Sequence, residues 1–149
     1  MYEFLEYRAL DVMTEEVQTV GPDTTLSQAQ DLFDKHEWNG LPVVGEDGEL
    51  LGLVTALDLL RAFEFHEDYT FPPYEMIMSR PVWTVMSRDV GTVRPRTPLT
   101  RVLHKLVDTG RKSLPVLDDD RRVIGIVARE DVLRGLRRAV SGEKPVDPI

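Results

Sequence analysis

The side chains with the clearest chemical potential are two aspartates, Asp58 and Asp131, each following an apolar run. Thr55 lies three positions before Asp58, and Thr-x-x-Asp is the spacing of a helix N-cap with a carboxylate in the first turn. The helix N-terminus keeps such a carboxylate ionised, and its two oxygens can accept charge-assisted hydrogen bonds from a pair of hydroxyl groups. A structural cap and a ligand contact are therefore compatible roles for Asp58. Before Asp131 the threonine is replaced by Ala128, so one hydroxyl is lost.

The other polar clusters carry weaker signals. The chain has no cysteine, which excludes disulfides, thiolate metal sites and cysteine nucleophiles. His66-Glu67-Asp68 lies in an acidic connection rather than in a metal-binding motif, and Asp118-Asp119-Asp120 lacks the EF-hand pattern and is expected to be a turn. There is no Gly-rich phosphate loop, no Ser/His/Asp order and no nucleophile elbow. We therefore predict no catalytic residue and no metal site.

An internal repeat positions the two aspartates. Shifting the chain by 73 positions aligns residues 12–63 with residues 85–136 without a gap and gives 17 identities. The matches include Val12-Met13 on Val85-Met86, Leu41-Pro42-Val43 on Leu114-Pro115-Val116, and Asp58 on Asp131. The chain is therefore predicted to contain two copies of one unit.

Each copy predicts the element order β-α-β-β-α. Short β-branched strands are expected at 17–20 and 90–93, and hairpins at 41–55 and in the matching second segment. Helices are expected from Thr25 with its capping partner Gln28, from Thr97 as N-cap of a helix whose first residue is Pro98, and over 56–65. A further short helix is expected over 74–79. The buried face of the second copy's first helix is predicted to consist of Leu99, Val102, Leu103, Leu106 and Val107.

Composition and charge limit the possible classes. The chain has 149 residues, 42% hydrophobic and 30% charged, which is typical of a globular protein of one domain or of two small units that share a core. The net charge of −8 argues against general nucleic-acid binding. The charge is asymmetric, because residues 1–74 sum to −13 and residues 75–149 to +5. We see no signal peptide and no apolar run that could cross a membrane, and we expect a cytoplasmic protein.

Each copy resembles a CBS motif, named from cystathionine β-synthase, and the pair resembles a Bateman module. The features that carry the resemblance are the Val-Met opening, Val-x-Thr-Val-x-Pro, Leu-Pro-Val and Gly-Leu-Val-Thr-Ala-Leu-Asp, which is Gly-Ile-Val-Ala-Arg-Glu-Asp in the second copy. The resemblance implies an α/β (α+β) fold of tandem CBS repeats packed with pseudo-twofold symmetry. The implied organisation is an N-terminal extension (1–10), repeat 1 (11–64), a linker (65–83), repeat 2 (84–140) and a flexible tail (141–149).

The resemblance also implies ligand sites in clefts between the repeats, where an aspartate binds the ribose of an adenosine compound. Carried over by position, the first pocket would take Thr55, Asp58, Asp89, Val90, Gly91, Arg111, Lys112 and Ser113. The second would take Asp131, Arg129, Glu16, Val17, Gln18, Trp38, Asn39 and Gly40. Arg111 and Lys112 could neutralise a phosphate. Arg129 could bind a phosphate or be a solvated charge, and Trp38 could stack on a base or be a packing anchor.

The implied function is regulatory and not enzymatic. The probable ligands implied are AMP, ADP, ATP or S-adenosylmethionine, with the signal passed through a homodimer to an unidentified regulated protein. The alternative is a structural module that dimerises or docks a partner without a physiological ligand. In the dimer, segments 25–37 and 56–68 sum to −5 and segments 98–110 and 129–140 to +3, which favours head-to-tail pairing.

Overall fold

The computed structural model describes residues 3–64 and 73–145, and the chain divides into two compact units. We call Gln18–Val90 the central unit, and Met1–Val17 together with Gly91–Ile149 the terminal unit. The terminal unit is therefore built from both ends of the chain. His66-Glu67-Asp68 lies outside the described residues. The helix expected over 56–65 is confirmed at its start but ends at Arg61.

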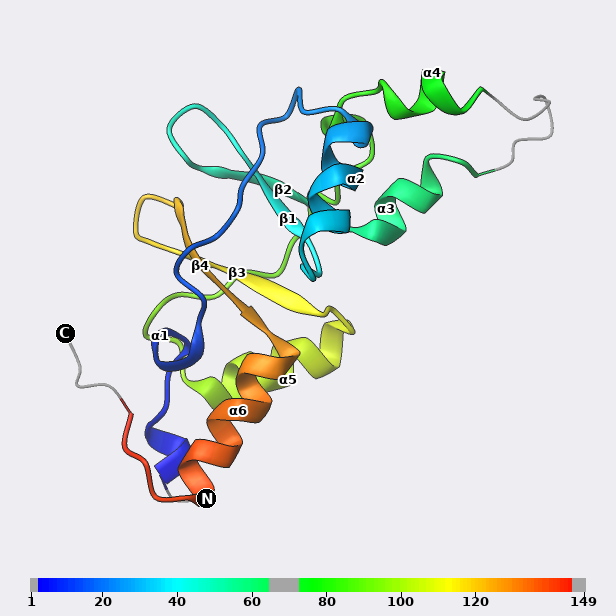
Figure 1. Cartoon of the computed structure of the whole chain (residues 1–149). Coiled ribbons are helices and arrows are strands. Elements are labelled where there is room, and N and C mark those ends of the chain that lie inside the picture. The colour runs from blue at the N-terminus through cyan, green and yellow to red at the C-terminus, as the bar shows by residue number, and fades with distance from the viewer. Residues whose placement is uncertain (1–2, 65–72, 146–149) are drawn as a thin grey trace. The chain divides into compact units, whose positions relative to one another are not determined.

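The central unit is a two-stranded hairpin with helices (Figure 1). β1 (Leu41–Val44) pairs antiparallel with β2 (Leu50–Val54), and Gly48, at φ 84°, allows the tight turn between them. The helices are α2 (Leu26–Lys35), α3 (Ala56–Arg61) and α4 (Tyr74–Met78), followed by the 3-10 turn η2 (Val82–Thr84). Thr25 and Gln28 form the expected reciprocal cap of α2, with Gln28 N donating to Thr25 Oγ1 at 3.1 Å. The short helix expected over 74–79 is confirmed as α4.

The terminal unit repeats this design. β3 (Ser113–Leu117) pairs antiparallel with β4 (Val123–Ala128), and α5 (Leu99–Thr109) packs beside α6 (Arg129–Val140). The N-terminal residues add the 3-10 turn η1 (Glu3–Glu6) and α1 (Ala9–Val12), both of which contact α6. The two matching turns differ at one backbone position, because Arg121 adopts φ 63° where the central unit has Gly48. A non-glycine residue in this left-handed region is strained.

The segment that opens each repeat, which we call its lead segment, pairs with the hairpin of the other repeat. The two lead segments are therefore exchanged. Thr14, which opens the first repeat, bridges to Ile126 in β4, and Ser87, which opens the second, bridges to Leu53 in β2. The two bridges are related by the shift of 73 positions. Each hairpin therefore receives its extra pairing from the segment that precedes the other repeat.

Each unit buries its own apolar core. The central core gathers residues from β1, β2, α2, α3, α4 and η2, among them Leu26, Leu41, Val54 and Val82, all fully buried. The terminal core combines α5, α6, β3 and β4 with Phe4 and Tyr7 from the N-terminal segment. Tyr7 also donates its hydroxyl to the Glu143 carbonyl at 2.9 Å, so the N-terminal segment and the end of the terminal unit are held together.

Three local expectations were wrong. The segments 17–20 and 90–93 are not strands, because each makes one parallel bridge only, Val20 to Val43 and Val93 to Val116, before a proline ends the extended run. Thr97 is not a helix cap, since α5 begins at Leu99 and Thr97 Oγ1 instead accepts from Arg94 N at 2.9 Å. Val107 is not on the buried face of α5, as it is 74% exposed.

Among residues 3–64 and 73–145, every helix is too short or too polar to cross a bilayer.

Candidate functional site

Asp58 sits in the first turn of α3, where local hydrogen bonds fix its carboxylate. Oδ2 accepts from Thr55 N at 2.8 Å and from Thr55 Oγ1 at 3.0 Å, and Thr55 Oγ1 accepts in turn from Asp58 N at 3.3 Å. The expected Thr55 cap is therefore confirmed. Oδ1 has longer contacts, 3.4 Å to Ser87 Oγ and 3.7 Å to Arg61 Nη1. Asp58 is only 2% exposed, and the helix start holds its carboxylate at a fixed position. Oδ1 is the less engaged of its two acceptor oxygens.

Asp131 holds the matching position at the start of α6 with different partners. Its Oδ2 accepts from Ala128 N at 2.7 Å, and its Oδ1 is paired with Arg134. Burial raises the pKa of the Asp131 carboxyl above its ordinary value of 3.8, while the Ala128 amide and the Arg134 guanidinium act in the opposite direction. In this unit both carboxylate oxygens are therefore engaged by close neighbours.

The basic pair Arg111-Lys112 lies in the loop between α5 and β3. Arg111 is half-buried, Lys112 is exposed, and Ser113 is buried as the first residue of β3, opposite Ala128 in the hairpin register. Arg129 approaches this loop from the start of α6 and donates to the carbonyls of Gly110 and Arg111. Its guanidinium is therefore not merely a solvated charge.

The other predicted contacts divide between the two units. Of the set expected around Asp58, the central unit holds Thr55, Asp58, Asp89 and Val90, and the terminal unit holds Gly91, Arg111, Lys112 and Ser113. Of the set expected around Asp131, the terminal unit holds Asp131, Arg129, Glu16 and Val17, and the central unit holds Gln18, Trp38, Asn39 and Gly40. Two composite pockets remain a prediction.

Within each unit some of these residues have defined environments. Asp89, Glu16 and Gln18 are exposed, Val90 and Val17 are half-buried, and Gly40 is buried. Gly91 lies close to Leu114 and Lys105, at 3.3 and 3.4 Å from the position that a Cβ would occupy. Half-buried Trp38 stacks on His36, with ring centroids 3.8 Å apart and planes at 14°. One face of the Trp38 ring is therefore already packed.

Three contacts of the aspartates were missed from the sequence. Ser87 reaches Asp58 from the exchanged lead segment, which no local pattern predicts. Arg61 and Arg134 each pair with the aspartate three positions earlier, and this signal was visible, because Asp-x-x-Arg occurs in both copies.

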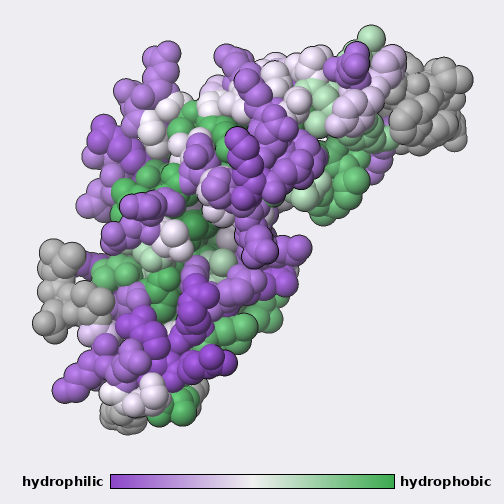
Figure 2. Space-filling view, in the orientation of Figure 1, coloured by the Kyte–Doolittle hydropathy of each residue, from purple (hydrophilic) through white to green (hydrophobic). Residues whose placement is uncertain are grey.

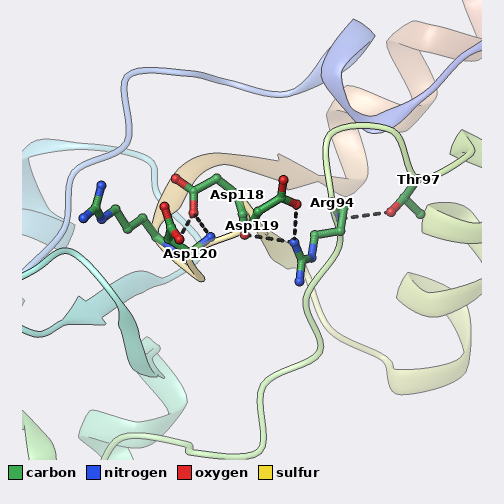
Figure 3. Close-up of polar contacts among 6 residues, drawn as sticks. Arg94, Thr97, Asp118, Asp119 and Asp120 are labelled. Atoms are coloured by element: carbon green, nitrogen blue, oxygen red, sulfur yellow. Dashed lines mark hydrogen bonds and ion pairs between the residues drawn. The ribbon is translucent and has the colours of Figure 1, made fainter.

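The acidic run Asp118-Asp119-Asp120 is a hairpin turn whose acceptors are used locally (Figure 3). Asp118 Oδ1 accepts from the amides of Asp120 and Arg122, both at 2.9 Å. Arg94 Nη1 donates to the Asp118 carbonyl at 3.0 Å and to Asp119 Oδ1 at 3.1 Å (Figure 3). The described residues, 3–64 and 73–145, contain no group of three His, Asp or Glu side chains that could hold a metal ion.

Comparison with known proteins covers both repeats. The family model described as CBS domain matches residues 9–64 and 77–138. A homoserine O-acetyltransferase of Methanohalobium evestigatum is 31% identical over 124 residues, which are 83% of this chain and 23% of that protein. The chain therefore spans about a quarter of the length of this enzyme.

Two solved structures are similar to this chain in fold. The CBS domain pair of protein MJ0100, in complex with 5′-methylthioadenosine and S-adenosyl-L-methionine, has a TM-score of 0.74 and 27% identity, covering 89% of this chain and 98% of the other. The structure of CBSX2 in complex with AMP has a TM-score of 0.77 and 27% identity, covering 90% and 98%. Both of these structures hold adenosine compounds.

Proposed function

Since the chain belongs to the CBS domain family, as a pair of such domains, we propose that it is a regulatory module that senses adenosine-type nucleotides. The observation that carries this proposal is the buried carboxylate of Asp58, held by the first turn of α3 with Oδ1 in long contacts only. A carboxylate oxygen held at a fixed position suits a hydrogen bond from a ribose hydroxyl. Complexes of similar proteins with AMP and with S-adenosyl-L-methionine support the ligand class.

The proposed main site combines Thr55, Asp58, Asp89 and Val90 with Gly91, Arg111, Lys112 and Ser113. It is supported by the difference between the aspartates, because Asp131 Oδ1 is already paired with Arg134 whereas Asp58 Oδ1 has weaker partners. The basic pair Arg111-Lys112 favours a phosphorylated ligand over bare adenosine. The site around Asp131, with Arg129, Glu16, Val17, Gln18, Trp38, Asn39 and Gly40, is the weaker or differently loaded one.

Signalling through a homodimer is the second part of the proposal. An apolar groove of about 280 Å³ lies between α2, α3 and α4, where the Phe63 and Tyr74 rings stack at 5.8 Å. Figure 2 shows hydrophobic surface over the α3 region, and Leu57 and Leu60 of α3 are more than half exposed. Exposed apolar helix faces of this kind suit a protein interface. A ligand would bias the dimer by its differential affinity for two arrangements.

The alternative is a dimerisation or docking module with no physiological ligand. Thermal unfolding with and without AMP, ADP, ATP and S-adenosylmethionine separates the two. A ligand at 100 times its dissociation constant stabilises the folded state by about 2.7 kcal/mol, which raises the melting temperature by several degrees. The doubly substituted Asp58→Ala, Asp131→Ala variant is the control and is expected to lose that shift. An unchanged melting temperature of the wild type with all four compounds would favour the docking module.

Phosphate recognition is tested by the ratio of the affinities for AMP and adenosine. The preference for AMP is expected to fall as salt is raised, because screening weakens the contribution of Arg111 and Lys112. The Lys112→Ala variant is expected to show a smaller preference at low salt. Equal affinities of the wild type for AMP and adenosine at low salt would contradict this part of the proposal.

Localisation in the cytoplasm stays a prediction from the sequence.

A further inference from the structure

Arg129 contacts three successive carbonyl groups of the α5–β3 loop. Its Nη2 donates to Gly110 O at 2.7 Å, its Nε to Arg111 O at 3.0 Å, and its backbone amide to Lys112 O at 3.0 Å. One residue at the start of α6 therefore fixes the whole backbone stretch that carries the basic pair. All four residues lie in the terminal unit.

This loop begins at the carboxyl end of α5, which is an unfavourable place for an anion. α5 ends at Thr109, and Gly110 turns the chain away at φ 70°. The last carbonyls of a helix carry partial negative charge, which would repel a phosphate bound nearby. The Arg129 guanidinium donates to carbonyls immediately after the helix and so offsets that charge.

The central unit provides the comparison. At the position matching Arg129 it has Ala56, which has no side-chain donor, and its matching loop is Glu37-Trp38-Asn39, without a cation. The bracing arginine therefore occurs in the one repeat whose loop is basic.

We propose that Arg129 is a positioning residue that holds the Arg111–Lys112 loop in place for the phosphate of a bound nucleotide. This inference rests on the proposed function, because it concerns the phosphate end of the proposed Asp58 site. Arg129 acts through the loop backbone, and Arg111 and Lys112 are the groups that meet the phosphate. Its contribution should therefore appear in the discrimination between phosphorylated and unphosphorylated ligands, and not in the binding of the nucleoside itself.

The test compares Arg129→Ala, Arg129→Lys and Arg137→Ala in the full chain by titration calorimetry with AMP and with adenosine at low salt. Arg137→Ala is the control, because it removes one exposed positive charge of the same helix without touching the loop. Arg129→Ala is expected to weaken AMP binding roughly tenfold, the size of one lost charge-assisted hydrogen bond, and to leave adenosine binding within about twofold. Arg129→Lys keeps the charge but lacks the planar fork that reaches two carbonyls, so we expect it to recover only part of the AMP affinity.

Amide hydrogen exchange supplies a readout that needs no ligand. Residues 111–113 are expected to exchange faster in Arg129→Ala than in the wild type or in Arg137→Ala, because the loop loses its brace. Equal loss of AMP and adenosine affinity in Arg129→Ala would overturn the inference in favour of a purely structural role, and unchanged AMP affinity would overturn it as well. A wild type that binds neither compound would instead refute the proposed function, and the inference would fall with it.

Discussion

At the start of α3, Thr55 closes the first helical turn with its hydroxyl, whereas at the start of α6 the matching residue is Ala128 and the turn is closed by backbone amide and carboxylate alone. The carboxylates behind these two residues are equally buried, and each is followed three positions later by an arginine. The pairing differs in kind, since Arg134 hydrogen-bonds Asp131 Oδ1 whereas Arg61 Nη1 lies 3.7 Å from Asp58 Oδ1, beyond hydrogen-bond distance. The two units thus keep the same scaffold and differ in how much of the carboxylate is left for another molecule.

The loops that are predicted to face these aspartates also differ in the groups that they offer to a ligand. The terminal unit carries Arg111-Lys112, braced by Arg129, and the central unit carries Trp38-Asn39, with Trp38 packed on His36. The comparison teaches that duplication has preserved the residues that build the helix starts and hairpins. The residues with ligand chemistry have diverged, so two sites of one family are predicted to be unequal.

The largest expected effect separates the two aspartates by affinity. Asp58→Ala is expected to weaken AMP binding by about 1.5 to 3 kcal/mol, because a charge-assisted contact is lost. Asp131→Ala is expected to have a smaller effect, since its Oδ1 is occupied by Arg134. Titration calorimetry of both variants measures the difference. Unchanged affinity of Asp58→Ala for AMP, ADP and ATP would show that the units do not differ in this way.

The second effect compares two buried glycines at the exchanged segments. A Cβ on either glycine would lie 2.7 to 2.8 Å from a flexible methionine sulfur, but it would lie 2.8 Å from the Ser87 carbonyl oxygen at Gly52 and 3.2 Å from the Thr14 carbonyl oxygen at Gly125. Gly52→Ala is therefore expected to cost about 2 kcal/mol of unfolding free energy and Gly125→Ala about 1. Chemical denaturation measures both. A larger loss for Gly125→Ala would mean that the Met13 side chain is the more rigid neighbour.

The third effect concerns the helix N-caps, where the cap residue of each unit is placed at the matching position of the other unit. Thr55→Ala is expected to lower the free energy of unfolding by about 1 kcal/mol, because the hydroxyl that accepts from Asp58 N is removed. Ala128→Thr is expected to raise it by roughly 0.5 to 1 kcal/mol, since Ala128 already has the extended backbone of an N-cap, at φ −99° and ψ 166°. Denaturant titrations of the two variants are the measurement, and a destabilised Ala128→Thr variant would contradict the expected gain.

A smaller effect is expected at the hairpin turns. Arg121 has φ 63° where the matching residue is Gly48, so Arg121→Gly is expected to stabilise the protein by about 0.5 kcal/mol through relief of backbone strain. Gly48→Ala, at φ 84°, is the reverse change and is expected to destabilise it. Melting temperatures of the two variants should therefore move in opposite directions.

The smallest effect concerns pH. Because burial raises the pKa of Asp131 above 3.8, the folded state holds this proton more tightly than the unfolded state. The contribution of Asp131 to stability is therefore greatest below pH 3.8 and declines as the pH rises through the raised pKa. Asp131→Asn does not titrate, so its stability relative to the wild type is expected to increase over that interval. Denaturant titrations from pH 3 upward measure it, and a difference independent of pH would contradict the raised pKa.

Local sequence signals predicted the local structure well. Thr25 with Gln28, Thr55 with Asp58, and the hairpins were predictable because each depends on residues at most a few positions apart. The cap at Thr97 failed because Arg94 N competes for the same hydroxyl, and nothing in the spacing distinguishes the two partners. Val107 failed because an i+8 position drifts from the centre of a helix face.

No local pattern predicts the exchanged segments, although the family resemblance implied that Asp89 and Val90, just after Ser87, lie in the Asp58 pocket. Thr14 pairs with Ile126 and Ser87 with Leu53 across long stretches of chain, and the repeat alignment alone does not give these pairings. Asp58 was predicted correctly as a carboxylate in the first turn of a helix, but its contact with Ser87 was missed. The pairing of segments at such separation depends on the packed fold and not on any local pattern.

The exchange of lead segments has a consequence for the order of events on the ribosome. The central unit is complete once Val90 has been made, so it can fold while the rest of the chain is still being synthesised. Thr14 is made early, but its partner Ile126 follows 112 residues later. At the usual rate of synthesis this delay is about 6 to 22 seconds. During this time Thr14 is without the strand that it will border, so a segment that is made before the central unit pairs only after that unit is complete.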